Sequence, residues 1–166
     1  FDELRFGVVQ TAYANGASGR FLRSHGIPVS IACTGVKNLH HVAIEKYDVG
    51  VYFEANGHGT VLFSPRAIEK IEFIGGKLKL AKDLINQCVG DALSDLLFVE
   101  AILEDENMTM SDWDNLYSEL PSRQLKIKVD DRSIFITTEA DTRLSSPHEI
   151  QYKVDDFVSK VPMGRA

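Results

Sequence analysis

The first 64 residues alternate between short apolar runs and amphipathic stretches. Between the apolar runs, residues 19–25 and 37–46 carry apolar positions at helical spacing and predict two short helices. Asn15 or Ser18 is suited to cap the first of these, and Gly26 to end it. The apolar runs, rich in β-branched and aromatic residues, predict strands over 4–13, 27–33, 48–53 and 60–64. The order β-α-β-α-β-β predicts an α/β layer with a mostly parallel sheet whose last pair is antiparallel.

The next part of the chain is predicted to be mainly helical. Pro65 opens a helical stretch, and between Lys82 and Leu103 apolar residues recur at steps of three and four. The stripe that they form comprises Leu84, Ile85, Cys88, Val89, Ala92, Leu93, Leu96, Leu97 and Val99. This spacing predicts one long helix with its stripe buried against the sheet.

The periodicity weakens after residue 111. We predict a short helix over 112–120, a half-exposed strand over 123–129, a polar irregular loop over 130–146 and a last helix over 148–161. One strand and one helix cannot bury their apolar faces without partners. We therefore expect a first domain over residues 1–120, and over 121–166 a linker with an incomplete α+β domain, as part of a larger protein.

Composition narrows the classes of partner. The chain has 166 residues, of which 44% are hydrophobic and 25% charged, as in ordinary globular proteins. A net charge of −6 without a basic cluster argues against nucleic acid as a partner. No apolar run approaches the ~20 residues of a membrane span, so no membrane association is predicted. Cys33 and Cys88 lack metal-ligand spacing and predict buried, reduced thiols, which favours a cytoplasmic location.

The stretch "FEANGHGT" (53–60) joins two predicted strands. Asn56 and Gly57 suit a hairpin turn, but a turn does not require the neighbouring Glu54 and His58. A carboxylate can accept hydrogen bonds from two adjacent hydroxyls, and a glycine allows close approach of the backbone. The stretch also follows a strand end, where α/β sheets bind ligands. These features favour a binding site for the vicinal diol of a sugar. From these residues alone, a hairpin turn with solvated polar side chains stays the alternative.

A second candidate site is "TGVKN" (34–38), which joins a predicted strand to a helix. Thr34 and the backbone amides of Gly35, Val36 and Lys37 are placed to crown the helix N-terminus, where anions are favoured. This position favours the neutral form of Lys37, which suits proton transfer or contact with a phosphate. The alternative is a helix cap with a surface lysine.

The sequence predicts no metal site in this chain. His40 and His41 are adjacent, and adjacent helical residues point about 100° apart, so they cannot easily chelate one ion. The chain has no HExxH motif and no pair of cysteines at ligand spacing.

Seven strings together carry a family resemblance: "GVVQTAYANGAS", "TGVK", "LHH", "DVGVYFEANGHGTVLFS", "GDALSDLLFVEAIL", "WDNLYSELPSRQLK" and "VDDFVSK". They closely resemble the eukaryotic phosphoacetylglucosamine mutases of the α-D-phosphohexomutase superfamily, over nearly the whole chain. The resemblance implies a three-layer α/β domain with a mixed, mostly parallel sheet over 1–120, the family's sugar-binding third domain. Residues 121–166 then resemble the linker and first strand and helix of its C-terminal, phosphate-binding fourth domain. One departure is Asn38, where the family usually has histidine.

The resemblance also implies an activity. The family interconverts N-acetylglucosamine 6-phosphate and 1-phosphate for UDP-N-acetylglucosamine synthesis, through a phosphoserine on the first domain and a glucosamine-type 1,6-bisphosphate. Mg²⁺ is held by the second domain, and an Arg-Pro-Ser-Gly-Thr loop of the fourth grips the non-reacting phosphate. The implied partners are a phosphorylated N-acetylhexosamine and the remaining domains of the same polypeptide.

The resemblance assigns roles to both candidate sites. By it, Lys37 is the general acid/base or phosphate contact, and the substrate-binding residues are Glu54, Asn56, Gly57, His58, Thr34, Gly35 and Val36. The serine, metal and phosphate loops of the family do not occur in these 166 residues. We therefore expect this chain alone to have no mutase activity and no Mg²⁺ site.

Two other functions stay open. A nucleotide-binding α/β domain would need a phosphate-cradling glycine loop after the first strand, and "YANGASG" is only a loose match. A non-catalytic sugar-phosphate-binding module would keep the fold without the chemistry.

Overall fold

The computed structural model describes residues 3–88 and 90–166, and the chain divides into two compact units, Phe1–Ser122 and Arg123–Ala166. The first half of unit one contains β1 (Phe6–Thr11), α1 (Gly16–Ser24), β2 (Val29–Ala32), α2 (Val36–Lys46), β3 (Val49–Phe53) and β4 (Gly59–Phe63). Its second half contains α3 (Pro65–Ile74), α4 (Gly76–Leu84), α5 (Ala92–Asp105) and α6 (Met110–Asp114). The second unit contains β5 (Ile136–Thr138), β6 (Arg143–Ser146) and α7 (His148–Ser159).

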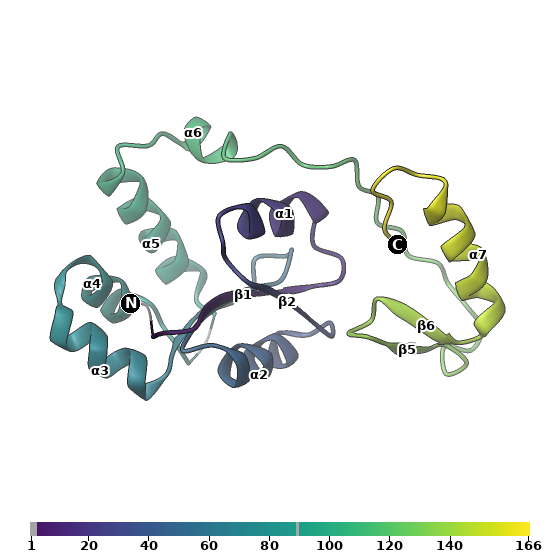
Figure 1. Ribbon diagram of the computed structural model, residues 1–166, viewed down its shortest axis with the longest axis horizontal. Coiled ribbons are helices and arrows are strands. Elements are labelled where there is room, and N and C mark those ends of the chain that lie inside the picture. Colours follow the sequence, from purple (N-terminus) through teal and green to yellow (C-terminus); the bar gives the residue numbers. More distant parts are fainter. Residues whose placement is uncertain (1–2, 89) are drawn as a thin grey trace. The chain divides into compact units, whose positions relative to one another are not determined.

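The sheet of the first unit has the strand order β2-β1-β3-β4. Strand β1 pairs in parallel with β2 and with β3, and β3 pairs antiparallel with β4. This confirms the predicted mixed, mostly parallel sheet with an antiparallel last pair. Figure 1 shows α1 on one side of β1 and β2 and α2 on the other. Because β1, β2 and β3 run the same way, the loops that follow them meet at one edge of the sheet.

One face of the sheet is sealed by α2. The helix turns Leu39 and Ala43, which lie four residues apart on one stripe, toward the sheet, and both are fully buried. They pack in one cluster with Val9, Ala32, Tyr47, Tyr52 and Leu62. This core fixes α2, and with it the loop between β2 and α2, relative to the strand ends.

A second cluster lies beneath α3. Ser64 caps this helix by accepting a hydrogen bond from the Ala67 N–H at 3.1 Å, and Pro65 follows at the first helical position. Ala67 and Ile71, four residues apart, are buried against other apolar side chains, including Leu4, Val49, Val61 and Phe63. The cap and the apolar stripe together explain why the chain turns into a helix directly after β4.

The single long helix predicted between Lys82 and Leu103 is wrong, because the chain leaves the helix between α4 and α5. There the Asn86 carbonyl accepts a hydrogen bond from Thr60 Oγ1 at 2.8 Å, and Gln87 Oε1 accepts one from the Phe63 N–H at 2.9 Å. Both donors belong to β4, so residues 86–87 cover that edge of the sheet. Asp91 then caps α5 by accepting from the Leu93 N–H at 3.0 Å. Val89 of the predicted stripe lies outside the described residues.

The predicted burial of the stripe is also wrong for most of α5. Leu93, Leu96 and Leu97 are exposed, and Leu103 is the buried residue of this helix. The helix faces the sheet across a cavity of about 760 Å³, whose lining includes Ala92, Leu96, Val99 and Ile102 of α5 and Val8, Val51, Phe53 and Val61 of the sheet. Because α5 has leucines on more than one side, its spacing could not define a single buried face.

Both cysteines are free thiols, but neither is buried as predicted. Cys33 directly follows β2, and Cys88 lies in the segment between α4 and α5 rather than in a helix. Each therefore stands beyond the end of a regular element, where the side chain faces solvent instead of a core.

The helix predicted over 112–120 is shorter and starts earlier. Thr109 and Asp112 form a reciprocal capping box, so α6 begins at Met110 and ends at Asp114. The chain then continues to Leu120, whose backbone pairs with the Asn15 side chain: the Asn15 amide donates to the Leu120 carbonyl at 2.9 Å, and Asn15 Oδ1 accepts from the Leu120 N–H at 3.2 Å. Asn15 also caps α1, so this one side chain ties the end of the unit to its beginning.

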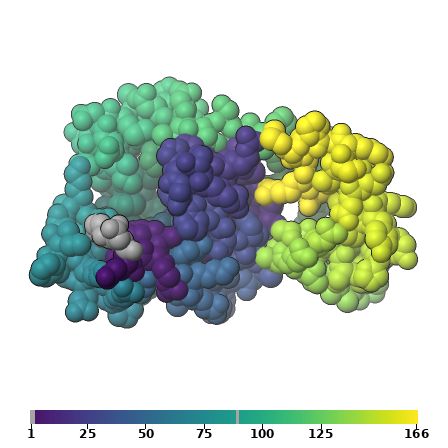
Figure 2. All heavy atoms as spheres, viewed as in Figure 1, coloured from purple at the N-terminus to yellow at the C-terminus, as the bar shows by residue number. Residues whose placement is uncertain are grey.

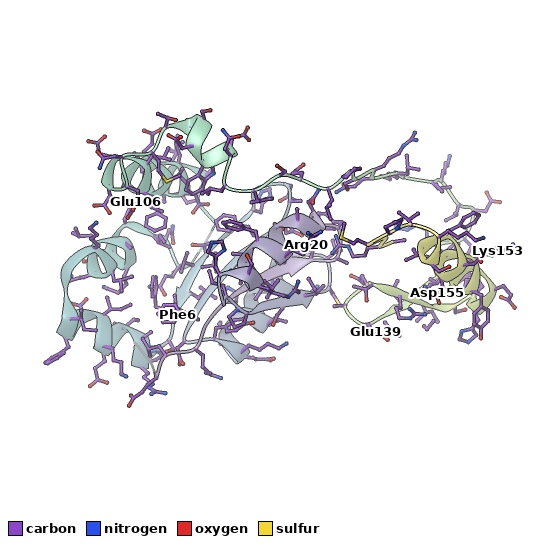
Figure 3. All side chains as sticks on the ribbon, turned by 45° about the horizontal axis from the view of Figure 1, so that its top comes forward. Phe6, Arg20, Glu106, Glu139, Lys153 and Asp155 are labelled. Atoms are coloured by element: carbon purple, nitrogen blue, oxygen red, sulfur yellow. The ribbon has the colours of Figure 1, made fainter. Side chains whose placement is uncertain are left out.

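The second unit is a hairpin with one helix. The strand predicted over 123–129 is absent, and its apolar residues Leu125 and Ile127 are exposed. Part of the predicted irregular loop forms the antiparallel pair β5–β6 instead. The final helix is confirmed as α7, which is held on β6 by an ion pair between Arg143 and Asp155 at 2.7 Å; Asp155 is labelled in Figure 3. In Figure 2 this unit occupies the yellow-green to yellow end of the colour bar.

Candidate functional site

Three loops meet at the edge where the parallel strands end. Tyr13 follows β1, Gly35 follows β2 and Glu54 directly follows β3. The Glu54 carboxylate joins them, because its Oε1 accepts one hydrogen bond from the Tyr13 hydroxyl at 3.2 Å and another from the Gly35 N–H at 3.1 Å. This is the edge at which open α/β sheets bind ligands.

Glu54 begins the turn of the β3–β4 hairpin. Its N–H donates to the His58 carbonyl at 2.8 Å, and its carbonyl accepts from the Gly57 N–H at 3.0 Å. Gly57 has φ +90°, a conformation that residues with a side chain rarely adopt. The hairpin turn predicted at Asn56-Gly57 is therefore confirmed. Gly57 is required there because of its positive φ.

The polar side chains of this turn form one network. Asn56 Nδ2 donates to Glu54 Oε2 at 3.3 Å, and Asn56 Oδ1 accepts from the His58 N–H at 3.0 Å. Asn56 Oδ1 also lies 3.0 Å from His58 Nδ1. Asn56 and His58 are exposed, whereas Glu54 is half-buried. Within residues 3–88 and 90–166 the structure contains no ion pair to Glu54, so its carboxylate keeps acceptor capacity on Oε2.

The loop between β2 and α2 supplies the other half of this edge. Gly35 is the N-cap residue of α2 with φ +116°, and no side chain from the described residues caps this helix. Asn38 closes the loop: its Nδ2 donates to the Thr34 carbonyl at 2.9 Å, and its backbone N–H donates to the Gly35 carbonyl at 2.8 Å. The sequence predicted that the Gly35 amide would be open to an anion, but the Glu54 carboxylate occupies it. The amides of Val36 and Lys37 lie in the first turn, where the helix dipole favours an anion.

The structure brings the predicted site residues into two adjoining groups. Glu54, Asn56, Gly57 and His58 share one turn, and the bond from Gly35 to Glu54 links that turn to the Thr34–Lys37 loop. Lys37 is exposed on the first turn of α2. It borders a cavity of about 300 Å³, lined by Val36, Lys37, His40, His41, Tyr52, Cys88 and Gly90.

Sequence reasoning missed Tyr13. The strand predicted over 4–13 includes Tyr13 at its end, whereas β1 ends at Thr11 and Tyr13 belongs to the loop that follows. The available signal was its position just past a parallel strand, at the edge where ligand sites gather. His40 instead has a local role, since its Nδ1 lies 3.1 Å from the hydroxyl of the buried Tyr52.

The described residues offer no cluster of metal-ligating side chains. Across residues 3–88 and 90–166, no group of three or more His, Cys, Asp or Glu side chains could hold a metal ion. Among the same residues, no helix has the length and apolar character that crossing a bilayer requires.

The mixed, mostly parallel sheet and the loops that meet at its edge define an α/β domain, and comparison with known proteins identifies the family. Residues 1–108 match the family model described as phosphoacetylglucosamine mutase AMG1, domain III. The chain is 49% identical to the phosphoacetylglucosamine mutase of Sus scrofa over 99% of its length, and 46% identical to that of Oryza sativa subsp. japonica over 97%. The chain therefore belongs to the phosphoacetylglucosamine mutase family, which confirms the resemblance.

Solved structures agree with this assignment. The N-acetylphosphoglucosamine mutase of Aspergillus fumigatus, in complex with GlcNAc-6P and magnesium, has a TM-score of 0.94 with 45% identity over 98% of this chain. A substrate complex of an N-acetylglucosamine-phosphate mutase, a member of the alpha-D-phosphohexomutase superfamily, has a TM-score of 0.93 with 46% identity over 98% of this chain. The chain spans about a third of the length of these relatives: 31% and 32% of the two curated sequences and 32% of each structure.

Proposed function

We propose that this chain is the sugar-binding third domain, with the start of the fourth, of a phosphoacetylglucosamine mutase. In this proposal the full-length protein interconverts N-acetylglucosamine 6-phosphate and N-acetylglucosamine 1-phosphate for UDP-N-acetylglucosamine synthesis in the cytoplasm. The main support is the Glu54 carboxylate, oriented by donors from two other strand-end loops while Oε2 keeps acceptor capacity. The relatives named above support the choice of reaction.

The Glu54 turn is proposed to hold the middle of the sugar ring. A carboxylate accepts charge-assisted hydrogen bonds, which are stronger than neutral ones, so sugar hydroxyls can compete with water for Oε2. Asn56 lies beside this oxygen and offers both a donor and an acceptor to a neighbouring hydroxyl. The mid-ring hydroxyls lie near the axis about which the sugar turns over between the two phosphoryl transfers. The same contacts therefore serve both orientations of the substrate.

The α2 N-terminus is proposed to face the reacting phosphate. Thr34, Gly35 and Val36 place the backbone there, and helix N-termini favour phosphate through unpaired N–H groups and the helix dipole. Lys37, on the same turn, is the candidate general acid/base for the sugar hydroxyl that gains or loses the phosphoryl group. His58 would add a contact near this phosphate.

Other domains are proposed to supply the remaining chemistry. The phosphoserine and the bound Mg²⁺ are assigned to them, since the described residues of this chain do not suit a metal ion. Mg²⁺ would neutralise the charge of the transferring group. A glucosamine-type 1,6-bisphosphate is the proposed intermediate; the A. fumigatus relatives include a complex with magnesium and a variant in complex with glucose1,6bisphosphate.

The test compares the full-length protein that contains this sequence with the 166-residue chain. Conversion of N-acetylglucosamine 6-phosphate to the 1-phosphate is followed by ³¹P NMR with Mg²⁺ present. We expect turnover by the full-length protein and none by the chain. Binding of the sugar phosphate without turnover by the full-length protein would replace the mutase with a non-catalytic sugar-phosphate-binding module. Binding of a dinucleotide but not of the sugar phosphate would favour a nucleotide-binding domain.

A further inference from the structure

The Glu54 side chain is held by groups that lie far away in the sequence. Tyr13, a half-buried residue in the loop after β1, donates its hydroxyl proton to Glu54 Oε1 over a distance of 3.2 Å. The Gly35 N–H from the loop after β2 donates to the same oxygen at 3.1 Å. A carboxylate oxygen has about two acceptor positions, so these two donors use the capacity of Oε1.

The two oxygens of the carboxylate therefore differ. The donor to Oε2 is Asn56 Nδ2, at the longer distance of 3.3 Å and from an exposed side chain. This leaves Oε2 with capacity for a further donor. The direction of Oε2 depends on how Oε1 is held.

The terminal torsion of a glutamate side chain is soft, with a broad and roughly two-fold energy profile. One donor alone would leave the carboxylate free to swing about that bond. Two donors from two different loops define the plane of the carboxylate and so the direction in which Oε2 points. Of the two donors, the Tyr13 hydroxyl can be removed by substitution without altering the backbone.

We propose that Tyr13 is a positioning residue: its hydroxyl fixes the Glu54 carboxylate so that Oε2 faces the sugar hydroxyls. Tyr13 acts on the substrate through Glu54 and not by its own contact. This inference rests on the proposed function, since it assigns Glu54 to the sugar.

A double-mutant cycle in the full-length protein tests this. Tyr13→Phe, Glu54→Gln and the double variant are compared by kcat/KM for N-acetylglucosamine 6-phosphate. Because the carboxylate itself is kept and only one orienting hydrogen bond is lost, Tyr13→Phe should lower kcat/KM by about 3- to 13-fold in the native background, the scale of an ordinary hydrogen bond. Because its effect passes through Glu54, the same substitution should change kcat/KM by less than about 2-fold when Glu54 is already glutamine.

Tyr47→Phe is the matched control. The Tyr47 hydroxyl lies 2.8 Å from Ser30 Oγ, so this change also removes one hydroxyl contact. Tyr47 precedes the start of β3, whereas Glu54 follows its end. Tyr47→Phe should lower the Tm slightly and leave kcat/KM unchanged. Tyr13→Phe should instead lower kcat/KM and leave the Tm unchanged.

The outcomes separate the inference from the function that it depends on. Equal loss of kcat/KM on Tyr13→Phe in both backgrounds, or a loss that matches a fall in folded protein, would overturn the positioning role. So would unchanged kcat/KM for Tyr13→Phe in a protein that Glu54→Gln impairs, and in that case the proposed function stands. Unchanged kcat/KM on Glu54→Gln would instead count against the proposed function itself.

Discussion

Strand β3 has a carboxylate at each end, and the two differ in burial, in spare acceptor capacity and in the edge of the sheet at which they lie. Asp48 directly precedes Val49, and Glu54 directly follows Phe53. Asp48 is buried, with 6% of its surface exposed. Its oxygens accept from the Arg5 N–H at 3.0 Å, from Arg5 Nε at 3.1 Å and from Ser64 Oγ at 3.1 Å.

These partners stabilise the ionised form of Asp48. Hydrogen bonds from the Arg5 backbone N–H, then from its guanidinium, outweigh the cost of burial and lower the pKa of Asp48 to about 2. Glu54 has donors too, but they leave Oε2 with spare capacity and Glu54 only half-buried. Asp48 is thus committed to holding β1, β3 and the start of α3 together, while Glu54 keeps the acceptor capacity that the proposed sugar contact requires.

The comparison shows that burial and hydrogen bonding alone do not mark a site. Both carboxylates are bonded to groups more than ten residues away in the sequence. They differ in spare acceptor capacity and in the edge of the sheet at which they lie, since ligands bind at the carboxyl ends of parallel strands. Substitutions at the two edges should therefore affect different properties of the protein.

The largest effect is expected for Lys37→Met, at the same edge as Glu54. If Lys37 transfers a proton, kcat in the full-length protein should fall by on the order of 100-fold with KM little changed. A rise in KM at unchanged kcat would assign Lys37 to phosphate binding. Steady-state kinetics with N-acetylglucosamine 6-phosphate decide between the two. Lys46→Met, at the far end of α2, is the control and should alter neither parameter.

Glu54→Gln should come next. If Glu54 is the charged acceptor for the sugar, as proposed, its loss should cost about 1.5–3 kcal/mol of transition-state stabilisation, or roughly a 10- to 150-fold fall in kcat/KM. Because Glu54 is half-buried in a turn, the Tm should stay within about 2 °C of the unsubstituted protein. Kinetics and thermal unfolding of the same preparation check both. If Glu54→Gln leaves kcat/KM unchanged, or lowers the Tm strongly, then Glu54 does not differ from Asp48 in serving the site rather than the fold.

Asp48→Asn should give the opposite pattern. Asparagine cannot accept from the Arg5 donors as an ionised carboxylate does, and a poorly satisfied buried group costs about 1–3 kcal/mol of stability. The Tm should fall by several degrees, while kcat/KM at a temperature where the protein is folded stays within about 2-fold. Reduced kcat/KM at full folding would show that Asp48 also serves the site.

Part of this fold could be predicted from the sequence because local signals were strong. The strands β1 to β4 and the helices α1 and α2 have clear periodicity, and Asn15 caps α1. The secondary-structure predictions were wrong where contacts between residues distant in the sequence override the local residue pattern. The Thr60 and Phe63 bonds to residues 86–87 divide the long helix, and residues 136–146 form a hairpin by pairing that no local residue pattern marked.

For the site the limit was different. The Glu54 turn stood out because a glutamate, an asparagine and a histidine exceed what a hairpin needs. The position of Tyr13 after a strand was available as a signal, but its hydrogen bond to Glu54 was not predictable. That bond depends on β1 and β3 being neighbours in the sheet, although Tyr13 and Glu54 lie 41 positions apart in the sequence. The occupation of the Gly35 amide by Glu54 follows from the same strand order. The local sequence does not show which residues become neighbours across a parallel sheet, because that depends on the strand order.

The smallest effect expected is the dependence of stability on acid. Asp48 has a pKa of about 2 when folded, against an ordinary value of 3.8, so folding favours its ionised form. The stability that this shift contributes, about 2 kcal/mol, is complete above about pH 5 and is lost as the pH falls toward 2. Asp48→Asn removes that part of the pH dependence. Its free energy of unfolding should be well below that of the unsubstituted protein at pH 6, and the gap should narrow toward pH 2.

Other carboxylates also titrate in this range, and the design must separate them from Asp48. Asp83 and Asp155 are partly exposed and have lowered pKa values because lysine or arginine side chains donate to them. Exposed ion pairs contribute little, and both variants and the unsubstituted chain share them, so they cancel in the difference. The measurement is urea unfolding between pH 2 and 6 for the unsubstituted protein, Asp48→Asn and Glu54→Gln. Parallel pH curves for the first two would show that Asp48 is no more committed to the fold than Glu54, and the contrast between the two ends of β3 would then rest on Glu54 alone.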